Sequence, residues 1–302
     1  MKALIKLFFN LFCRVLSLSR SLFNLMFKGD QVIFCYHNVS PTPSEFEAKY
    51  DLCHSPDVFN KQLIFLSNHF EWLHPEELGS GKGGALLTFD DGYRDSILVG
   101  GKLLEQHRAF AVFFLNMAPI LRREAFLVSA ADSERQDFLE TRPTDDLGQR
   151  LVLMKTLNID FISKEELVSI ELKKKGRFFW GNHFYNHYNA PALTSQELVE
   201  QYRENEIELK KFESSLNFFA YPFGQRKVCY SQETNDLISK LGARFIFAAH
   251  PFPQAGGKLK YRYSLGINSM RNTDIRYDLI RQKLLGYFYK YKSWREGDES
   301  NI

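Results

Sequence analysis

The stretch ALLTFDDGY, residues 85–93, joins a short apolar run to two adjacent carboxylates and a glycine. An apolar run of this length predicts a strand, with Asp90 and Asp91 at its carboxyl end. In α/β barrels the loops that follow the strands open onto one face and carry the active site. Two neighbouring carboxylates can divide the work there, one binding a metal ion and the other moving a proton. A strand that ends in a simple Asp-Gly turn is the structural alternative.

Similar apolar runs recur along the chain and alternate with helical patterns. The seven runs are Val32–Tyr36, Ala85–Phe89, Phe110–Leu115, Phe178–Trp180, Phe218–Tyr221, Arg244–Ala248 and Tyr263–Ile267. Residues that begin helices lie between them, at Ser55-Pro56, Ser163…Glu166 and Thr194…Glu197. Strands separated by helices indicate parallel βαβ units. We therefore predict one α/β barrel or doubly wound sheet over residues 31–268, with an insertion at about residues 119–158.

A second motif, FFWGNHFYNH at residues 178–187, also runs from an apolar strand into a loop. It places His183 and His187 four residues apart. Two imidazoles and one carboxylate form a common three-ligand metal set that leaves a coordination position for water. An isolated histidine pair is more often incidental. Because Asp90 and Asp91 stand at an equivalent strand end, the two motifs together predict a metal site.

Four short motifs carry a family resemblance. They are CYHNV (residues 35–39), TFDDGY (88–93), GNHFYNH (181–187) and FFAYPFG (218–224). In this order they resemble the polysaccharide deacetylases of carbohydrate esterase family 4, and the YHxV start is similar to the poly-N-acetylglucosamine deacetylase branch. The resemblance covers about residues 31–268. It implies a distorted (β/α)7 barrel that hydrolyses acetamides on amino sugars.

The resemblance also implies roles for individual residues. Asp91, His183 and His187 would hold a divalent metal, with Zn as the first choice and Co, Ni, Fe or Mn as alternatives. Asp90 would be the general base. The backbone N–H of Phe223, at the family's Tyr position, would help to hold the tetrahedral oxyanion.

The resemblance is less clear at the residues that would orient the base and protonate the product. Ala220 stands where many family members carry an Arg that orients the base, although the YPFG form recurs in relatives with the YHxV start. His250, after the apolar run 245–249, is the candidate general acid, with a structural histidine as the alternative. His37, at the end of the first strand, could support the metal or the substrate, or simply pack there. Tyr221 is assigned with Phe223 to the substrate side.

The first thirty residues form a segment of their own. The polar residues follow one stripe at steps of three and four: Lys6, Asn10, Arg14, Ser17, Ser21, Asn24 and Lys28. Arg14 and Arg20 argue against an export signal. Burying Arg14 in a spanning helix would cost about 2.5–3.5 kcal/mol. We predict an amphipathic helix over residues 1–30 that lies in a membrane surface, with packing on the barrel or on a partner as the alternative.

Residues 269–302 contain basic residues interleaved with aromatic ones, for example Lys290 and Lys292 beside Tyr289 and Tyr291. Such a segment suits a second membrane contact. The alternative is a basic surface helix that closes the barrel. The basic N-terminal segment favours an anionic cytoplasmic leaflet.

The composition adds general limits to these assignments. A net charge of +3 does not indicate a nucleic-acid partner. The four cysteines show no CxxC spacing, which weakly suits a reducing compartment.

The sequence therefore predicts a metal-dependent deacetylase of a lipid-linked or nucleotide-linked N-acetyl sugar in lipopolysaccharide or surface-glycan assembly. It would lie peripherally at the cytoplasmic face of the inner membrane, or be soluble in the cytoplasm. The alternative functions are a catalytically impaired sugar-binding relative, or a deformylase or esterase acting on the same kind of sugar.

Overall fold

The computed structural model describes residues 2–122, 160–173, 176–225, 228–250, 252 and 257–295. Most of the predicted insertion, residues 119–158, lies outside these ranges, as do the last residues, 296–302. The part of the insertion that is described belongs to a helix that begins at Met117.

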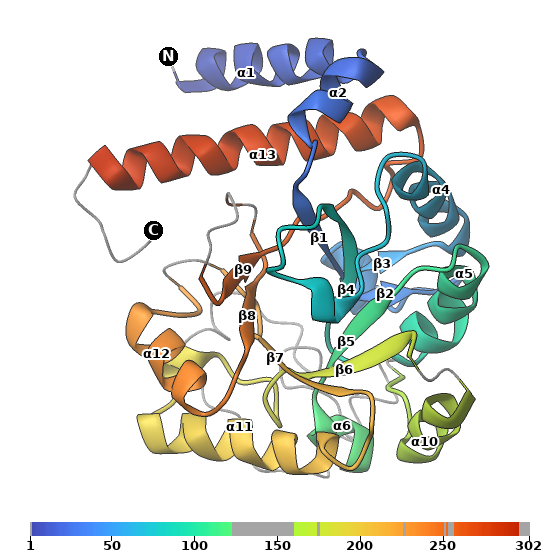
Figure 1. Ribbon diagram of the computed structural model, residues 1–302, viewed down its shortest axis with the longest axis vertical. Helices are drawn as coiled ribbons and strands as arrows, with labels where there is room; N and C mark the ends of the chain where they lie inside the picture. Colours follow the sequence, from blue (N-terminus) through green and yellow to red (C-terminus); the bar gives the residue numbers. More distant parts are fainter. Residues whose placement is uncertain are drawn as a thin grey trace.

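The strands and helices follow one another in the alternation that the sequence predicts (Figure 1). The strands are β1 (Gln31–Tyr36), β2 (Asn38–Val39), β3 (Cys53–His54), β4 (Gly84–Phe89), β5 (Ala111–Leu115), β6 (Phe178–Asn182), β7 (Ser215–Ala220), β8 (Phe245–Ala248) and β9 (Leu259–Tyr261). The helices are α1 (Lys2–Ser17), α2 (Arg20–Met26), α3 (Glu45–Lys49), α4 (Pro56–Ser67), α5 (Gly101–Gln106), α6 (Met117–Arg122), α10 (Lys164–Lys173), α11 (Ser195–Leu209), α12 (Gln232–Lys240) and α13 (Asn272–Arg295). Short turns of 3-10 or π type lie at Pro75–Glu77, Ser96–Gly100 and Ala190–Ala192.

Seven parallel strands form one sheet in the order β1-β4-β5-β6-β7-β8-β9. A parallel bridge between Phe34 and Tyr263 joins the segment after β9 to β1, so the sheet is nearly closed into a barrel. The predicted distorted (β/α)7 barrel is confirmed. Side chains from successive strands, including Ile33, Val112 and Phe247, form an apolar cluster buried in this sheet.

The last strand differs from the prediction. The sequence predicts it at Tyr263–Ile267, whereas β9 ends at Tyr261 and Tyr263 contributes a single bridge. Lys260 and Arg262 interrupt the apolar pattern, and both are buried. Buried cations at this edge of the barrel therefore hide the strand from a hydrophobicity pattern.

The three predicted helix starts are confirmed. Ser55 accepts a hydrogen bond from the backbone of α4, with Pro56 in the first turn. Thr194 and Glu197 form a capping box at the start of α11. Ser163 exchanges the same two hydrogen bonds with Glu166 at α10.

The N-terminal segment is two helices rather than the predicted single one, because Ser19 caps a new helix, α2, by accepting from the backbone N–H of Leu22. Helix α1 lies along the C-terminal helix α13 (Figure 1). Over the described residues, no helix combines the length and apolar character needed to cross a membrane.

Candidate active site

The predicted metal ligands converge at the carboxyl ends of two strands. Asp91 follows β4, His183 follows β6, and His187 lies in the loop beyond. The Oδ1 atom of Asp91 is 3.3 Å from Nε2 of His183 and 3.1 Å from Nε2 of His187. All three residues are buried, and one potential ligand atom from each lies within 4.8 Å of the others. The structure thus brings together the three residues that the sequence singled out.

Protonation and hydrogen bonding in this cluster suit a cation. The Nδ1 atom of His183 lies 2.8 Å from the backbone oxygen of Ala220, which can only accept, so Nδ1 donates to this oxygen and Nε2 faces Asp91. Burial lowers the pKa of His187, although Asp91 opposes the shift, which keeps this imidazole neutral. The buried Oδ1 of Asp91 accepts no well-aligned hydrogen bond. Two imidazoles around an unsatisfied carboxylate oxygen fit a divalent metal.

The backbone around these ligands is unusual. Asp91, His187 and Phe223 adopt positive φ angles of 76°, 59° and 62°. Such conformations cost about 1–3 kcal/mol each in residues other than glycine, and they cluster at functional sites. Gly224 follows with φ +58°, and a Cβ there would lie 2.6 Å from the backbone nitrogen of Ala249. The turn that carries Phe223 therefore requires glycine at its next position.

Asp90 is held by an arginine that the sequence analysis missed. Nη1 and Nη2 of Arg262 donate to the two carboxylate oxygens of Asp90 at 2.6 and 2.8 Å. Arg262 is completely buried and Asp90 is 3% exposed. Burial alone would raise the pKa of Asp90, but the guanidinium outweighs it and holds this pKa below its usual value. Arg262 thus orients Asp90 and stabilises its ionised form. The resemblance assigns the orienting role to an arginine at the position of Ala220.

A cavity of about 320 Å³ opens over these groups. Its lining includes Cys35, His37, Phe46, Tyr50, Asp90, Asp91, Tyr93, His183, His187, Phe223, Gln225 and Leu265. A few convergent polar groups among aromatic walls are typical of small-ligand sites. A bound amide could therefore reach the carboxylates and imidazoles while a sugar ring rests on the aromatic side chains.

The remaining predicted residues divide into two groups. His37 and Phe223 line the cavity, and the ring of Phe223 lies 5.0 Å from that of His187. Tyr221 and His250 are not among the described residues that line it. Tyr221 donates to the hydroxyl of Thr234 at 3.2 Å, and His250 lies 3.5 Å from the hydroxyl of Tyr230. The roles predicted for these two residues stay predictions.

A strand-end cluster of one carboxylate and two imidazoles, beside a second carboxylate, is a candidate metal site on a parallel barrel. The family model for polysaccharide deacetylases matches residues 79–246. The chain therefore belongs to the polysaccharide deacetylase family, whose members hydrolyse N-acetyl amide bonds of sugars. No curated protein matches the sequence significantly.

Several solved structures share the fold of this chain. The deacetylase PplD of Streptococcus pyogenes, in complex with acetate, has a TM-score of 0.60 at 16% identity, covering 83% of this chain and 97% of its own. IcaB from Ammonifex degensii has a TM-score of 0.57 at 17% identity, with 82% and 97% covered. A de-N-acetylase from Aggregatibacter actinomycetemcomitans has a TM-score of 0.56 at 15% identity, with 82% and 99% covered. At these identities the likeness concerns the fold.

Proposed function

We propose that this enzyme removes the N-acetyl group from a lipid-linked or nucleotide-linked amino sugar, a precursor of lipopolysaccharide or a surface glycan, with the help of a divalent metal. The observation that carries the proposal is the convergence of Asp91, His183 and His187 beside the Asp90–Arg262 pair in one cavity. Each of these groups has a defined part in amide hydrolysis.

Asp91, His183 and His187 would hold the metal. Two imidazoles and a carboxylate favour Zn, with Co, Ni, Fe or Mn as alternatives. When bound, the ion would acidify water at the site and polarise the acetamide carbonyl. The carbonyl oxygen of Ala220 fixes the ring of His183 through Nδ1, so the imidazole is oriented before any ligand arrives.

Asp90 would take the proton from the attacking water. Its low pKa keeps the carboxylate ionised at neutral pH, and the two hydrogen bonds from Arg262 fix its plane. This pair also weighs against a catalytically impaired relative, since the absence of an arginine at Ala220 was an argument for that alternative. Arg262, which lies 172 residues after Asp90 in the sequence, contacts this carboxylate instead.

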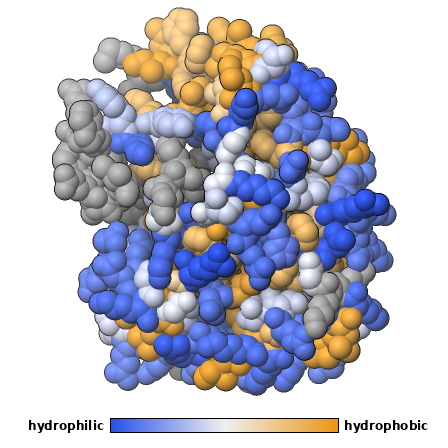
Figure 2. Space-filling model, in the orientation of Figure 1, coloured by the Kyte–Doolittle hydropathy of each residue, from blue (hydrophilic) through white to orange (hydrophobic). Residues whose placement is uncertain are grey.

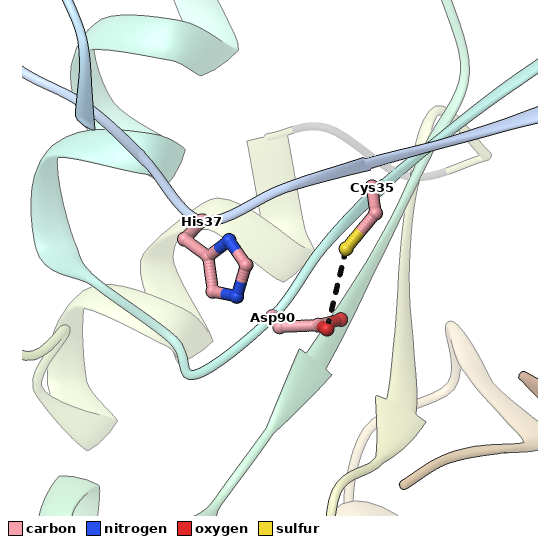
Figure 3. A group of neighbouring side chains, drawn as sticks. All are labelled: Cys35, His37 and Asp90. Atoms are coloured by element: carbon pink, nitrogen blue, oxygen red, sulfur yellow. Dashed lines mark hydrogen bonds between the residues drawn. The ribbon is translucent and has the colours of Figure 1, made fainter. Parts of the chain in front are cut away.

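Protonation of the departing amine has two candidates. His250 was predicted from its position at a strand end, but it stacks on Tyr230 with ring centroids 6.1 Å apart and, unlike its neighbour Ala249, is not among the described residues that line the cavity. His37 lines the cavity beside Asp90 (Figure 3). We propose His37 as the donor. His37→Gln should then lower the rate at least ten-fold while the metal stays bound, and His250→Gln should lower it less.

We also propose that α1 lies on a lipid surface. The polar stripe of α1 faces α13: Arg281 donates to Asn10 at 3.2 Å, Arg14 donates to Asp274 at 2.8 Å, and Arg276 donates to the backbone oxygen of Ser17 at 2.6 Å. The apolar face is left outward, as Figure 2 shows by the hydrophobic side chains gathered over α1. The outward residues are Leu4, Ile5, Leu7, Phe8, Leu11, Phe12, Val15 and Leu18, each more than half exposed.

An anionic bilayer is the occupant that the chemistry favours. The aromatic side chains Tyr287, Phe288, Tyr289 and Tyr291 of α13 are exposed too, and Lys6 and Arg20 are exposed basic residues of the N-terminal helices. Apolar side chains flanked by aromatic and basic ones suit insertion at the level of the lipid headgroups. We propose on this basis a peripheral position at the cytoplasmic face of the inner membrane.

Mass spectrometry of candidate substrates tests the proposed reaction. Lipid-linked and nucleotide-linked N-acetyl sugars are incubated with the native enzyme and with Asp90→Asn, which serves as the matched control. Loss of one acetyl group with native enzyme alone is the expected result. Deacetylation of free oligosaccharides with both carrier-linked pools unchanged would contradict the proposed carrier.

A further inference from the structure

A second group of potential ligands lies in the same cavity, on the other side of Asp90. Cys35 is the fifth residue of β1 and His37 follows the end of that strand, while Asp90 follows β4. The parallel register pairs Cys35 with Thr88, which places the two strand ends side by side. The Sγ atom of Cys35 lies 3.5 Å from Oδ2 of Asp90, and His37 lies beside the same carboxylate (Figure 3).

The three side chains offer one sulfur, one nitrogen and one oxygen ligand within 4.8 Å of one another. Cys35 and Asp90 are buried. A thiolate with an imidazole and a carboxylate selects Zn²⁺ or Cd²⁺ over the oxygen-seeking Mg²⁺ and Ca²⁺. The reaction proposed above gives Cys35 no role.

We propose that Cys35, His37 and Asp90 form a second cation site, and that a thiophilic divalent ion bound there inhibits the enzyme by occupying its general base. The inhibitory part rests on the proposed function, whereas the binding part does not. Binding exchanges a proton for the ion: the S–H bond of Cys35 breaks, a sulfur–metal bond forms, and the proton leaves to solvent.

The pair with Arg262 is compatible with this site. Oδ2 of Asp90 accepts from Arg262 at 2.8 Å, but a carboxylate oxygen has a second lone pair that can face Cys35 and His37. The guanidinium adds a positive charge beside this site, and an ion held by Asp91 would add another. We therefore expect the second site to fill after the first and at higher metal concentration.

Cadmium binding to the metal-depleted full-length protein tests the proposal. Equilibrium dialysis should give about two Cd²⁺ per native chain and about one for Cys35→Ala. A thiolate-to-cadmium charge-transfer absorption should grow with the weaker binding step in the native protein and be absent from Cys35→Ala. Cys53→Ala is the matched control, because Cys53 is also buried but lies 3.7 Å from a backbone oxygen, that of Ser40. It should behave like the native protein.

Two further variants keep the result interpretable. Asp91→Ala should lose the first site and keep one Cd²⁺ with the thiolate absorption. If Cys35→Ala does not fold, Cys35→Ser replaces it. Its circular dichroism is compared with that of the native protein to show that it is folded. One Cd²⁺ per native chain without thiolate absorption, or the absorption unchanged in folded Cys35 variants, would overturn the proposal.

Inhibition is measured separately. Activity with excess Zn²⁺ is divided by the activity of the same protein at one equivalent. This ratio should be at least five-fold lower for the native protein than for Cys35→Ala. Equal ratios would overturn the inhibitory role and leave the binding result standing. If no metal supports activity, the proposed function fails, while the cadmium stoichiometry still decides whether the site exists.

Discussion

The barrel and the α1–α13 helix pair differ in what they leave exposed to solvent. In the barrel, apolar side chains from every strand are enclosed, and buried charges such as Asp90 and Arg262 are paired with each other. Helices α1 and α13 also bury some apolar side chains, such as Cys13 and Leu279, and polar contacts join them, but Phe8 and Leu11 of α1 face outward at 62% and 58% exposure. The barrel therefore has the burial pattern of a protein in water, and the helix pair does not.

This difference shows what each region needs for its stability. An isolated buried charge costs several kcal/mol, so the barrel depends on exact pairing at its active site. An exposed apolar face of this extent is unusual for a protein in water and marks an interaction surface.

Removing Arg262 should affect both stability and activity. Arg262→Met leaves Asp90 buried without its partner, which should cost about 3–5 kcal/mol in the free energy of unfolding. Without the guanidinium the pKa of Asp90 rises, so the acidic limb of the activity profile should move to higher pH. Urea denaturation and a pH–rate profile measure the two effects. Arg203→Met, which removes an exposed pair with Glu206, is the control, and equal losses in both variants would contradict the role given to Arg262.

The outward face of α1 should control membrane binding. The double variant Phe8→Glu with Leu11→Glu should weaken binding to anionic vesicles at least about 100-fold, because each buried apolar side chain contributes about 1.5–3 kcal/mol. Co-sedimentation measures this. The control is Ile207→Glu on α11, which changes an apolar side chain that is 61% exposed elsewhere on the surface. Native protein that stays in the supernatant at low salt would contradict the membrane proposal.

Acid should destabilise the barrel through His54. Burial lowers the pKa of His54 from 6.5 to about 4. The unfolded chain therefore takes up a proton first, and stability present above pH 6.5 is lost as the pH falls toward about 4. His54→Gln can still donate to the oxygen of Leu265 and should lose about 2–3 kcal/mol less over this range. Denaturation of metal-free native and variant proteins at both pH values checks this, and parallel losses would show that His54 is not responsible.

Breaking the contact between α1 and α13 should have a smaller effect on stability than the changes within the barrel. Arg14→Met removes the ion pair with Asp274 and the stacking on Tyr277, whose ring centroid is 4.0 Å from the guanidinium carbon. Arg14 is half exposed, so the loss in stability should be about 1 kcal/mol or less. Thermal unfolding measures it. A loss as large as that of Arg262→Met would mean that the two regions do not differ in the way described.

Much of the site could be predicted because its residues follow local signals. Asp91 and His183 stand directly after apolar strands, and the carboxyl ends of parallel strands meet at one face. Arg262 could not be found in this way, because it lies 172 residues from Asp90 in sequence. In the sequence, Arg262 is a charged residue between Tyr261 and Tyr263. A pattern of apolar residues therefore indicates that a strand is interrupted there and does not indicate a site.

The N-terminal helix shows a related limit. The positions of its polar residues predicted one stripe on a single helix, whereas the structure has two helices, and contacts with α13 involve Asn10, Arg14 and Ser17 of the first. They did not predict that Asn10 and Arg14 would face a partner helix, because that depends on residues of α13 such as Arg281 and Asp274. The break at Ser19 was also missed, since the spacing of polar residues continues through it. Patterns within one segment define a face but not what covers it.

Metal-restored activity of native and His187→Ala proteins tests the central claim most directly. Both are stripped with a chelator, supplied with one equivalent of Zn²⁺ or Co²⁺, and assayed for bound metal and for acetate released from the N-acetyl sugar that the native enzyme deacetylates in the mass-spectrometric assay. The native protein should bind about one ion and regain its activity, while His187→Ala should bind less and release at least 100-fold less acetate. Full acetate release by the stripped native protein, or by His187→Ala without metal, would contradict the account.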